Sequence, residues 1–128
     1  MADDNLIHGD LSRAVISAFF EVYNTMGYGF LEHIYCVAME GELKSRGLAA
    51  GREVAVEVRY KGNRVGFQRL DMVVDDKIIV EIKSSAVLSP TAKRQLHNYL
   101  RATDLEVGLL LHFGPSPKFY RQVVTRPN

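Results

Sequence analysis

The sequence has almost no cysteine, no tryptophan and no long hydrophobic run. Its single cysteine, Cys36, cannot form an internal disulfide, which favours a reducing compartment. The longest apolar runs, such as residues 107–111, fall far short of the roughly 20 residues that a membrane-spanning helix needs. The first ten residues are acidic and polar, unlike a secretory signal. We therefore expect a cytoplasmic protein without membrane insertion.

The chain also has a small net charge and no flexible linker. The formal net charge is +1, so bulk charge indicates no particular partner. Residues 89–128 carry six basic and two acidic side chains, which makes this part of the chain the better candidate for contact with an anion. No repeat or Pro/Gly-rich linker divides the 128 residues, of which 47% are hydrophobic. We expect a single domain covering residues 1–128.

The spacing of apolar residues predicts three helices and five strands. Helical spacing covers residues 10–26, capped by Asp10, residues 30–46, and a third segment that opens with Ser89 as cap and Pro90. Strand signals cover residues 53–60, 64–74, 77–83, 105–113 and 118–124, with a turn at residues 61–64 and an edge strand at the end. The order ααβββαββ predicts an α/β (α+β) fold with a mixed central β-sheet flanked by helices.

Two charges interrupt one of the most apolar strands, KIIVEIK at residues 77–83. Strand alternation places Ile78, Val80 and Ile82 on one face, and Glu81 and Lys83 on the other. A surface ladder of compensating charges on a half-exposed sheet would explain such a pattern. Whether these charges also belong to a functional site depends on the preceding strand, which carries the acidic residue Asp71.

The loop between these two strands sets which residues face each other. The apolar residues of the preceding strand share one face: Leu70, Met72 and Val74. A loop of odd length, for example residues 75–77, places Asp71 directly opposite Glu81 with their Cβ atoms about 5 Å apart. A two-residue loop would put Asp71 on the apolar face, where an unpaired carboxylate is costly. We therefore expect one wholly apolar face and one face that presents Asp71, Glu81 and Lys83.

Asp71 and Glu81 would then form a pair of carboxylates at cross-strand distance. Such a pair repels unless one carboxylate takes a proton or a cation lies between them. Oxygen ligands of this kind suit Mg²⁺ or Mn²⁺, which commonly bind one or two protein carboxylates and keep water or phosphate oxygens. Lys83 could stabilise charge on a phosphate or help to position and deprotonate a water. These residues are suited to metal-assisted phosphodiester hydrolysis.

Three short motifs follow one another in the order of the predicted elements. GFLEHIY spans residues 29–35, Asp71 precedes E-x-K at residues 81–83, and QLHNY spans residues 95–99. Together they resemble the PD-(D/E)XK nuclease superfamily, and the first resembles the motif of its GxxExxY group. The likeness covers about residues 10–124 and implies a restriction-endonuclease-like core with DNA or RNA as substrate. Leu70 stands where a proline can precede the aspartate.

The resemblance also implies roles for individual residues. The implied catalytic residues are Asp71, Glu81, Lys83, Gln95 and Tyr99. The implied metal site consists of Glu32, Asp71, Glu81 and Ile82. Plainer interpretations remain: Glu32 as a favourable first-turn glutamate, and Gln95 with Tyr99 as the polar edge of an amphipathic helix. Tyr35 and Cys36 are expected to pack in the core, and His112 to be a buried, hydrogen-bonded histidine.

The leading expectation is a small Mg²⁺- or Mn²⁺-dependent nuclease that acts on DNA or RNA. We expect it to form a homodimer. An alternative is a non-catalytic module on the same fold that binds nucleic acid or a protein partner. A third interpretation is an interaction protein that dimerises through the edge strand at residues 118–124. Cleavage assays, metal affinity and mass in solution separate the three.

Overall fold

The computed structural model describes residues 6–125 as three helices and five strands. The helices are α1 (Gly9–Met26), α2 (Glu32–Ser45) and α3 (Ala92–Ala102). The strands are β1 (Ala50–Tyr60), β2 (Asn63–Val74), β3 (Ile78–Ser84), β4 (Val107–Phe113) and β5 (Pro117–Val123). The observed order ααβββαββ confirms the prediction. Within the described residues, no helix is both long enough and apolar enough to cross a membrane.

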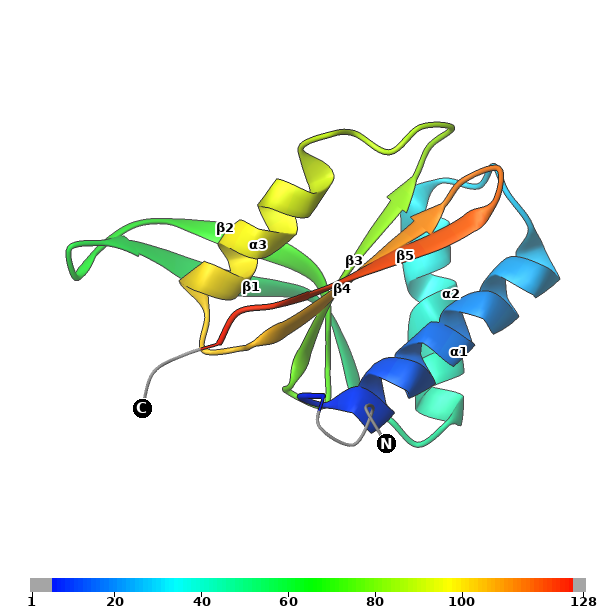
Figure 1. Cartoon of the computed structure of the whole chain (residues 1–128), viewed down its shortest axis with the longest axis horizontal. Helices are drawn as coiled ribbons and strands as arrows, with labels where there is room; N and C mark the ends of the chain where they lie inside the picture. The colour runs from blue at the N-terminus through cyan, green and yellow to red at the C-terminus, as the bar shows by residue number, and fades with distance from the viewer. Residues whose placement is uncertain (1–5, 126–128) are drawn as a thin grey trace.

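The strands form one mixed sheet in the order β1-β2-β3-β4-β5. Only β3 and β4 are parallel, and α3 provides the crossover that a parallel pair requires. Figure 1 shows α1 and α2 together on one side of the sheet and α3 on the other. All seven residues of β4 are buried, which explains why the strand is apolar apart from His112. β5 is an edge strand, as predicted, and β1 forms the other edge.

The larger core lies between the sheet and the pair α1 and α2. Its centre is a cluster of aromatic rings in which Phe113 of β4 meets Phe19 of α1 edge-on, at 4.8 Å between centroids. Tyr35 of α2 stacks on the same Phe113 ring, with centroids 4.0 Å apart. Tyr35 is fully buried, so its predicted place in the core is confirmed. This stacking fixes the N-terminal half of α2 against the sheet.

A smaller core lies beneath α3. Leu96 and Leu100 of the helix pack on Leu70, Ile79 and Leu110 of the sheet. The helix approaches very closely at Gly108, where an added Cβ would lie 2.6 Å from Leu96 Cδ1. This second core means that both faces of β2 and β3 are covered over part of their length.

Several element boundaries differ from the predictions: β1 begins at Ala50 and not at residue 53, and β4 at Val107 and not at residue 105. α1 begins at Gly9 with His8 in the cap position, so Asp10 lies in the first turn and does not cap the helix. α3 begins at Ala92 and not at Pro90, because the Ser89 carbonyl accepts a hydrogen bond from the Ala92 amide and closes a tight turn first. The β1–β2 turn is shorter than residues 61–64, since Tyr60 already pairs with Asn63.

Candidate active site

The β2–β3 hairpin has the register that brings Asp71 and Glu81 together. Val74 pairs with Ile78 and Met72 with Val80, which leaves residues 75–77 as a three-residue loop. The prediction of an odd loop is therefore confirmed. The same register places Asp71 opposite Glu81, one step beyond the last paired residues.

At this position, hydrogen bonds from backbone amides to the two carboxylates replace the backbone-to-backbone hydrogen bonds between β2 and β3. The Asp71 amide donates a hydrogen bond of 2.8 Å to Glu81 Oε2, and the Ile82 amide donates one of 2.8 Å to Asp71 Oδ2. Each acidic side chain is thus held by the backbone of the opposite strand. Among residues 6–125, the second oxygen of each carboxylate accepts no hydrogen bond. One oxygen of each group is therefore available to a ligand.

The face assignment of Leu70 was wrong. Leu70 packs in the smaller core beneath α3, whereas Met72 packs in the larger core. The cause is an irregularity where β1 crosses Asp71: Arg52 pairs with Met72 and Val54 with Leu70, while Glu53 between them has a φ of 55° and is unpaired. Alternation therefore reverses at this point. The face that carries Glu81 is partly covered by α3.

This covering helix makes Glu81 a buried acid. Glu81 is 5% exposed. Burial, followed by the nearby charge of Asp71, raises the pKa of Glu81 to about 8, while the hydrogen bond from the Asp71 amide and the charge of Lys83 oppose the rise. Without a cation, this carboxyl is therefore mostly protonated at pH 7.

Besides burial, the charges of Asp71 and Glu81 raise the pKa values of residues on α2 and α3. Burial raises the pKa of the Cys36 thiol on α2 to about 12, and the charges of Asp71, Glu32 and Glu81 add to the rise. Burial also raises the pKa of Tyr99 on α3, assisted by the charges of Glu81 and Asp71. The carboxylate pair thus lies between α2 and α3. Cys36 is buried and uncharged, consistent with the packing role predicted for it.

A cleft beside the pair contains three of the predicted site residues. Glu32 of α2, Lys83 of β3 and Gln95 of α3 line this cavity of about 290 Å³, which we call the site cleft, together with part of the segment from Ser85 to Ala92. Tyr99 lines an adjoining cavity that Gln95 also reaches. The structure therefore brings all the predicted side chains to one region. Lys83 lowers the pKa of Glu81 through its charge and not through a direct hydrogen bond.

The GFLEHIY motif has a structural explanation. Gly29 has a φ of 113°, a conformation that favours glycine, in the link between α1 and α2. The Tyr35 hydroxyl donates a hydrogen bond of 2.5 Å to the Gly27 carbonyl and accepts one of 3.3 Å from the Phe30 amide. Tyr35 thus holds the link that precedes Glu32, the first residue of α2.

Ser84 anchors this link to the sheet, and sequence reasoning missed it. Its hydroxyl donates a hydrogen bond to the Phe30 carbonyl, and its amide donates one of 3.3 Å to Glu32 Oε2. A serine that directly follows E-x-K was the only signal, and it gives no hint of a partner 52 residues earlier in the chain. Ser84 connects the end of β3 to the predicted metal-site residue Glu32.

The donor set fits a hard divalent cation with two protein carboxylates. Asp71 and Glu81 each keep one oxygen without a hydrogen bond, and the raised pKa of Glu81 reflects its burial first and the nearby charge of Asp71 second. Within residues 6–125, no group of three or more His, Cys, Asp or Glu side chains is close enough to hold a metal ion. Glu32 is instead bonded to Ser84. Water or phosphate oxygens would have to supply the remaining ligands.

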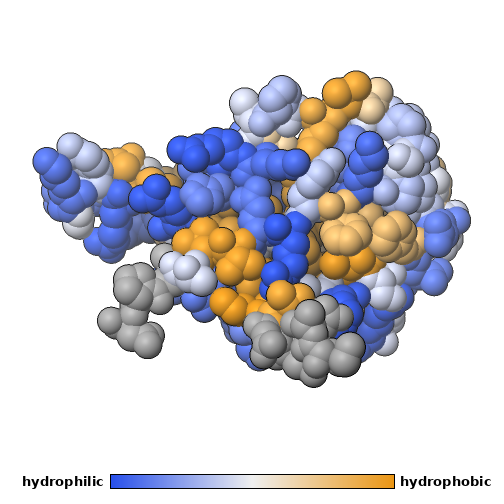
Figure 2. Space-filling model, in the orientation of Figure 1, coloured by the Kyte–Doolittle hydropathy of each residue, from blue (hydrophilic) through white to orange (hydrophobic). Residues whose placement is uncertain are grey.

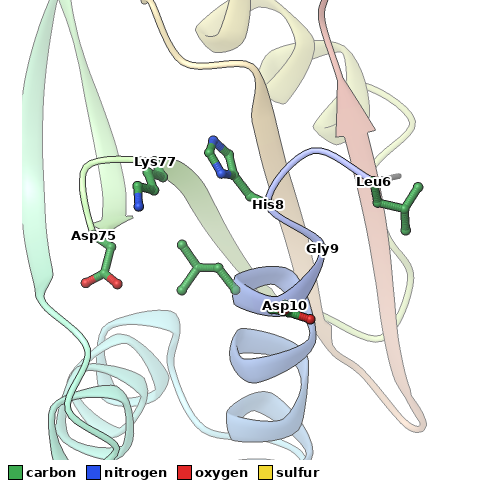
Figure 3. Close-up of a pocket in the computed structure, with 7 residues that line it drawn as sticks. Leu6, His8, Gly9, Asp10, Asp75 and Lys77 are labelled. Atoms are coloured by element: carbon green, nitrogen blue, oxygen red, sulfur yellow. The ribbon is translucent and has the colours of Figure 1, made fainter. Parts of the chain in front are cut away.

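Two other features involve none of the predicted site residues. A cavity of about 420 Å³ lies between the start of α1 and the β2–β3 turn, with His8, Asp75 and Lys77 around it, at the other end of β3 from Lys83 (Figure 3). None of the predicted site residues lines it. His112 is 4% exposed and its Nε2 atom lies 2.8 Å from the Ser85 carbonyl, which confirms the expected buried, hydrogen-bonded histidine.

A family model described as the PD-(D/E)XK nuclease superfamily matches residues 9–124. The crystal structure of SSO0001 is similar to this chain, with a TM-score of 0.57 and 26% sequence identity over 71% of this chain and 48% of that one. The chain therefore spans about half the length of SSO0001. Among curated proteins, no sequence matches it.

Proposed function

The chain belongs to the PD-(D/E)XK nuclease superfamily, and from this premise we propose that it hydrolyses phosphodiester bonds in DNA or RNA with Mg²⁺ or Mn²⁺. Members of the superfamily generally use divalent metal ions and act on nucleic acids. The observation that carries the proposal is the convergence of Asp71 and Glu81, each with one oxygen held by the opposite strand and the other oxygen free for a ligand.

Asp71 and Glu81 would hold the ion in this scheme. A divalent ion bound there supplies positive charge to a phosphate oxygen and lowers the pKa of a bound water. Ile82 lies between Glu81 and Lys83, and its carbonyl oxygen would be its ligand atom. Its amide already bonds Asp71 Oδ2, so the backbone at this residue helps to orient the acidic pair. Glu32 would complete the site from α2.

The other residues act on water and phosphate. Lys83 follows Glu81 by two residues on β3 and lines the site cleft, where a phosphate would bind in this scheme. There it would position and help to deprotonate the attacking water, or stabilise negative charge on the phosphate. Gln95 and Tyr99 lie one helical turn apart on α3 and would orient the phosphate or Lys83.

We further assign the chain to the GxxExxY group, on the basis of Gly29, Glu32 and Tyr35. The three motif residues contribute in different ways. Gly29 takes a left-handed conformation, Tyr35 holds the link by two hydrogen bonds, and Glu32 begins α2 facing Ser84. In this proposal, the motif positions a third carboxylate, that of Glu32, at the metal-binding region.

The test is cleavage of labelled single-stranded and double-stranded DNA and RNA by the purified protein, with Mg²⁺, with Mn²⁺ and with EDTA. We expect metal-dependent cleavage that falls by about 10²-fold or more in Lys83→Ala. Lys77→Ala is the matched control, because it removes an exposed lysine directly before the same strand. Equal cleavage by wild type and Lys83→Ala would remove the catalytic assignment.

A non-catalytic binding module on the same fold is the second candidate, and the burial of Glu81, which favours its protonated form, is the observation behind it. The two candidates differ in metal affinity. Calorimetry with Mg²⁺ or Mn²⁺ should detect binding that depends on Asp71 and Glu81 if the protein is a nuclease. A module that only binds nucleic acid needs no such affinity.

A further inference from the structure

The β1–β2 hairpin extends well beyond the rest of the sheet. The β2–β3 ladder ends at Met72, whereas the β1–β2 ladder continues to the pair of Tyr60 and Asn63. At about 3.3 Å per residue, the stretch of β2 from Asn63 to Asp71 spans roughly 26 Å. Figure 1 shows this projection at the left, with α3 along part of it. We call residues 54–69 the arm.

The arm is basic. Its basic side chains are Arg59, Lys61, Arg64 and Arg69, and its one acidic side chain is Glu57. Glu57 pairs with Arg59, and Arg69 lies 3.7 Å from Glu53 at the base of the arm. Lys61 and Arg64 form no ion pair within residues 6–125. The two cations at the end of the arm are therefore not neutralised by a carboxylate.

These two cations lie instead over exposed aromatic rings. Lys61 Nζ is 5.4 Å from the centroid of the Tyr60 ring, and Arg64 Cζ is 4.9 Å from that of Phe67. Tyr60 is 63% exposed and Phe67 57% exposed. Figure 2 shows the projecting lobe as largely hydrophilic with a small hydrophobic patch. Exposed rings beside cations are the surface on which nucleic-acid bases stack while their phosphates meet positive charge.

A cavity leads from the arm towards the candidate active site. It measures about 520 Å³ and lies between Arg59 and Gln68 of the arm and Gln95, Tyr99 and Arg101 of α3. Gln95 also lines the site cleft. A strand whose phosphate lies in the site cleft could therefore continue past α3 onto the arm without leaving the protein surface.

We infer that the arm binds a single-stranded segment of DNA or RNA that flanks the scissile phosphate. Tyr60 and Phe67 stack on unpaired bases, and Lys61 and Arg64 contact phosphates. Single-stranded nucleic acid fits better than duplex, because bases in a duplex are already stacked on one another. At the spacing of a stacked strand, about 3.4 Å per phosphate, roughly 26 Å corresponds to about eight nucleotides, and a more extended single strand covers it with fewer. This inference rests on the proposed nuclease function.

The test measures binding separately from cleavage, by fluorescence anisotropy of labelled oligonucleotides in EDTA. Single-stranded 12-mers of DNA and of RNA should bind more tightly than the matched duplex and than a 4-mer. Phe67→Ala should weaken binding of the single-stranded 12-mers by between about 5-fold and about 100-fold. Lys61→Gln and Arg64→Gln should each lower the slope of log affinity against log salt by about 0.7.

Two variants serve as matched controls. Lys77→Gln removes the same charge from the neighbouring hairpin turn, and Phe119→Ala removes an aromatic ring that is 39% exposed on β5. Both should bind single strands as the wild type does. Circular dichroism confirms that each variant is folded. A comparison of the DNA and RNA 12-mers shows which polymer the arm prefers.

The inference and the proposed function fail in different ways. If Phe67→Ala and Lys61→Gln bind as wild type, or if the controls lose as much affinity, the arm is not the binding surface. Tighter binding of duplex that Phe67→Ala does not change would also overturn the inference, as would a dimer that Phe67→Ala dissociates. Arm-dependent binding without any metal-dependent cleavage would support the inference and refute the nuclease.

Discussion

Asp71 and Glu81 face each other across β2 and β3, and each carboxylate is bonded to the backbone of the other strand, at 2.8 Å in both cases. These hydrogen bonds occupy amides that would otherwise join the sheet. The acidic pair therefore ends the β2–β3 ladder and is held rigidly at the point where the strands separate. The other oxygen of each carboxylate takes no part in this pairing.

The first prediction concerns the stability of the metal-free protein against pH. Folding raises the pKa of Glu81 from 4.5 to about 8, so the native state holds a proton that the unfolded state releases. The stabilising contribution is fully present below about pH 4.5 and is lost as pH rises through about 8. The free energy of unfolding should fall by up to about 1.4 kcal/mol per pH unit within this window. Urea denaturation in EDTA measures it.

Glu81→Gln is the control for that measurement, because it removes the titrating group and keeps the side-chain shape. The difference in unfolding free energy between wild type and Glu81→Gln should change steadily from pH 5 to pH 8. A difference that stays constant with pH would show that Glu81 does not carry the raised pKa.

The second prediction concerns Tyr35→Phe, which keeps the stacked ring and removes only the hydroxyl. Two hydrogen bonds to the α1–α2 link are lost, so the unfolding free energy should fall by about 1–3 kcal/mol. Because the link precedes Glu32, cleavage should also fall while Asp71-dependent metal binding remains. Tyr28→Phe is the comparison, since Tyr28 is a 45% exposed tyrosine in the same link. Equal stability of the two variants would contradict the role of Tyr35.

The third prediction concerns the contact between α3 and the sheet. In Gly108→Ala the new Cβ would meet Leu96 Cδ1 at 2.6 Å, so the variant should lose about 1–3 kcal/mol of stability. The shift of α3 should also disturb Gln95 and Tyr99 and lower cleavage. Gly41→Ala in α2 has open space around its Cβ and should be more stable by about 0.5–1 kcal/mol. Thermal unfolding of both variants gives the comparison.

The fourth prediction ranks the acidic residues by their contribution to metal affinity. Asp71→Asn should weaken Mn²⁺ binding by more than about 100-fold, because it removes one of the two converging carboxylates. Glu32→Gln should weaken it by about 10-fold, because the Glu32 side chain is exposed and bonded to Ser84. Calorimetry at fixed pH provides both values. A larger loss for Glu32→Gln than for Asp71→Asn would contradict this ranking.

The homodimer expected from the sequence stays a prediction, as does dimerisation through the edge strand. β5 is at the edge of the sheet, with one side of its backbone unpaired within the described sheet. Light scattering of the purified protein tests the assembly, and a Pro substitution at Phe119 would separate edge pairing from other contacts.

The sequence was most informative where burial made one arrangement much lower in free energy than the others. The Asp71–Glu81 register followed from the cost of an aspartate on the apolar face, and the structure has that register. The order of elements followed from periodicity alone. Both conclusions depend on the neighbours of a residue along one hairpin or one helix.

Other features depend on contacts between distant segments and had no such signal. Strand alternation gives no sign that α3 covers the second face of β3, so the burial of Glu81 was not foreseen. Glu53 adopts a φ of 55° without the glycine that would mark such a position, and the reversal that moves Leu70 to the α3 side follows from it. The link from Ser84 to Glu32 joins residues with no common sequence pattern.

The most direct test of the central idea is a crystal structure of the protein with Mn²⁺, with the ion located by its anomalous scattering. The account predicts one strong peak about 2.1 Å from oxygen atoms of both Asp71 and Glu81. The peak should disappear in Asp71→Asn crystals soaked in the same way. A peak that binds neither carboxylate, or no peak between them at saturating Mn²⁺, would contradict the assignment of this pair as the metal centre.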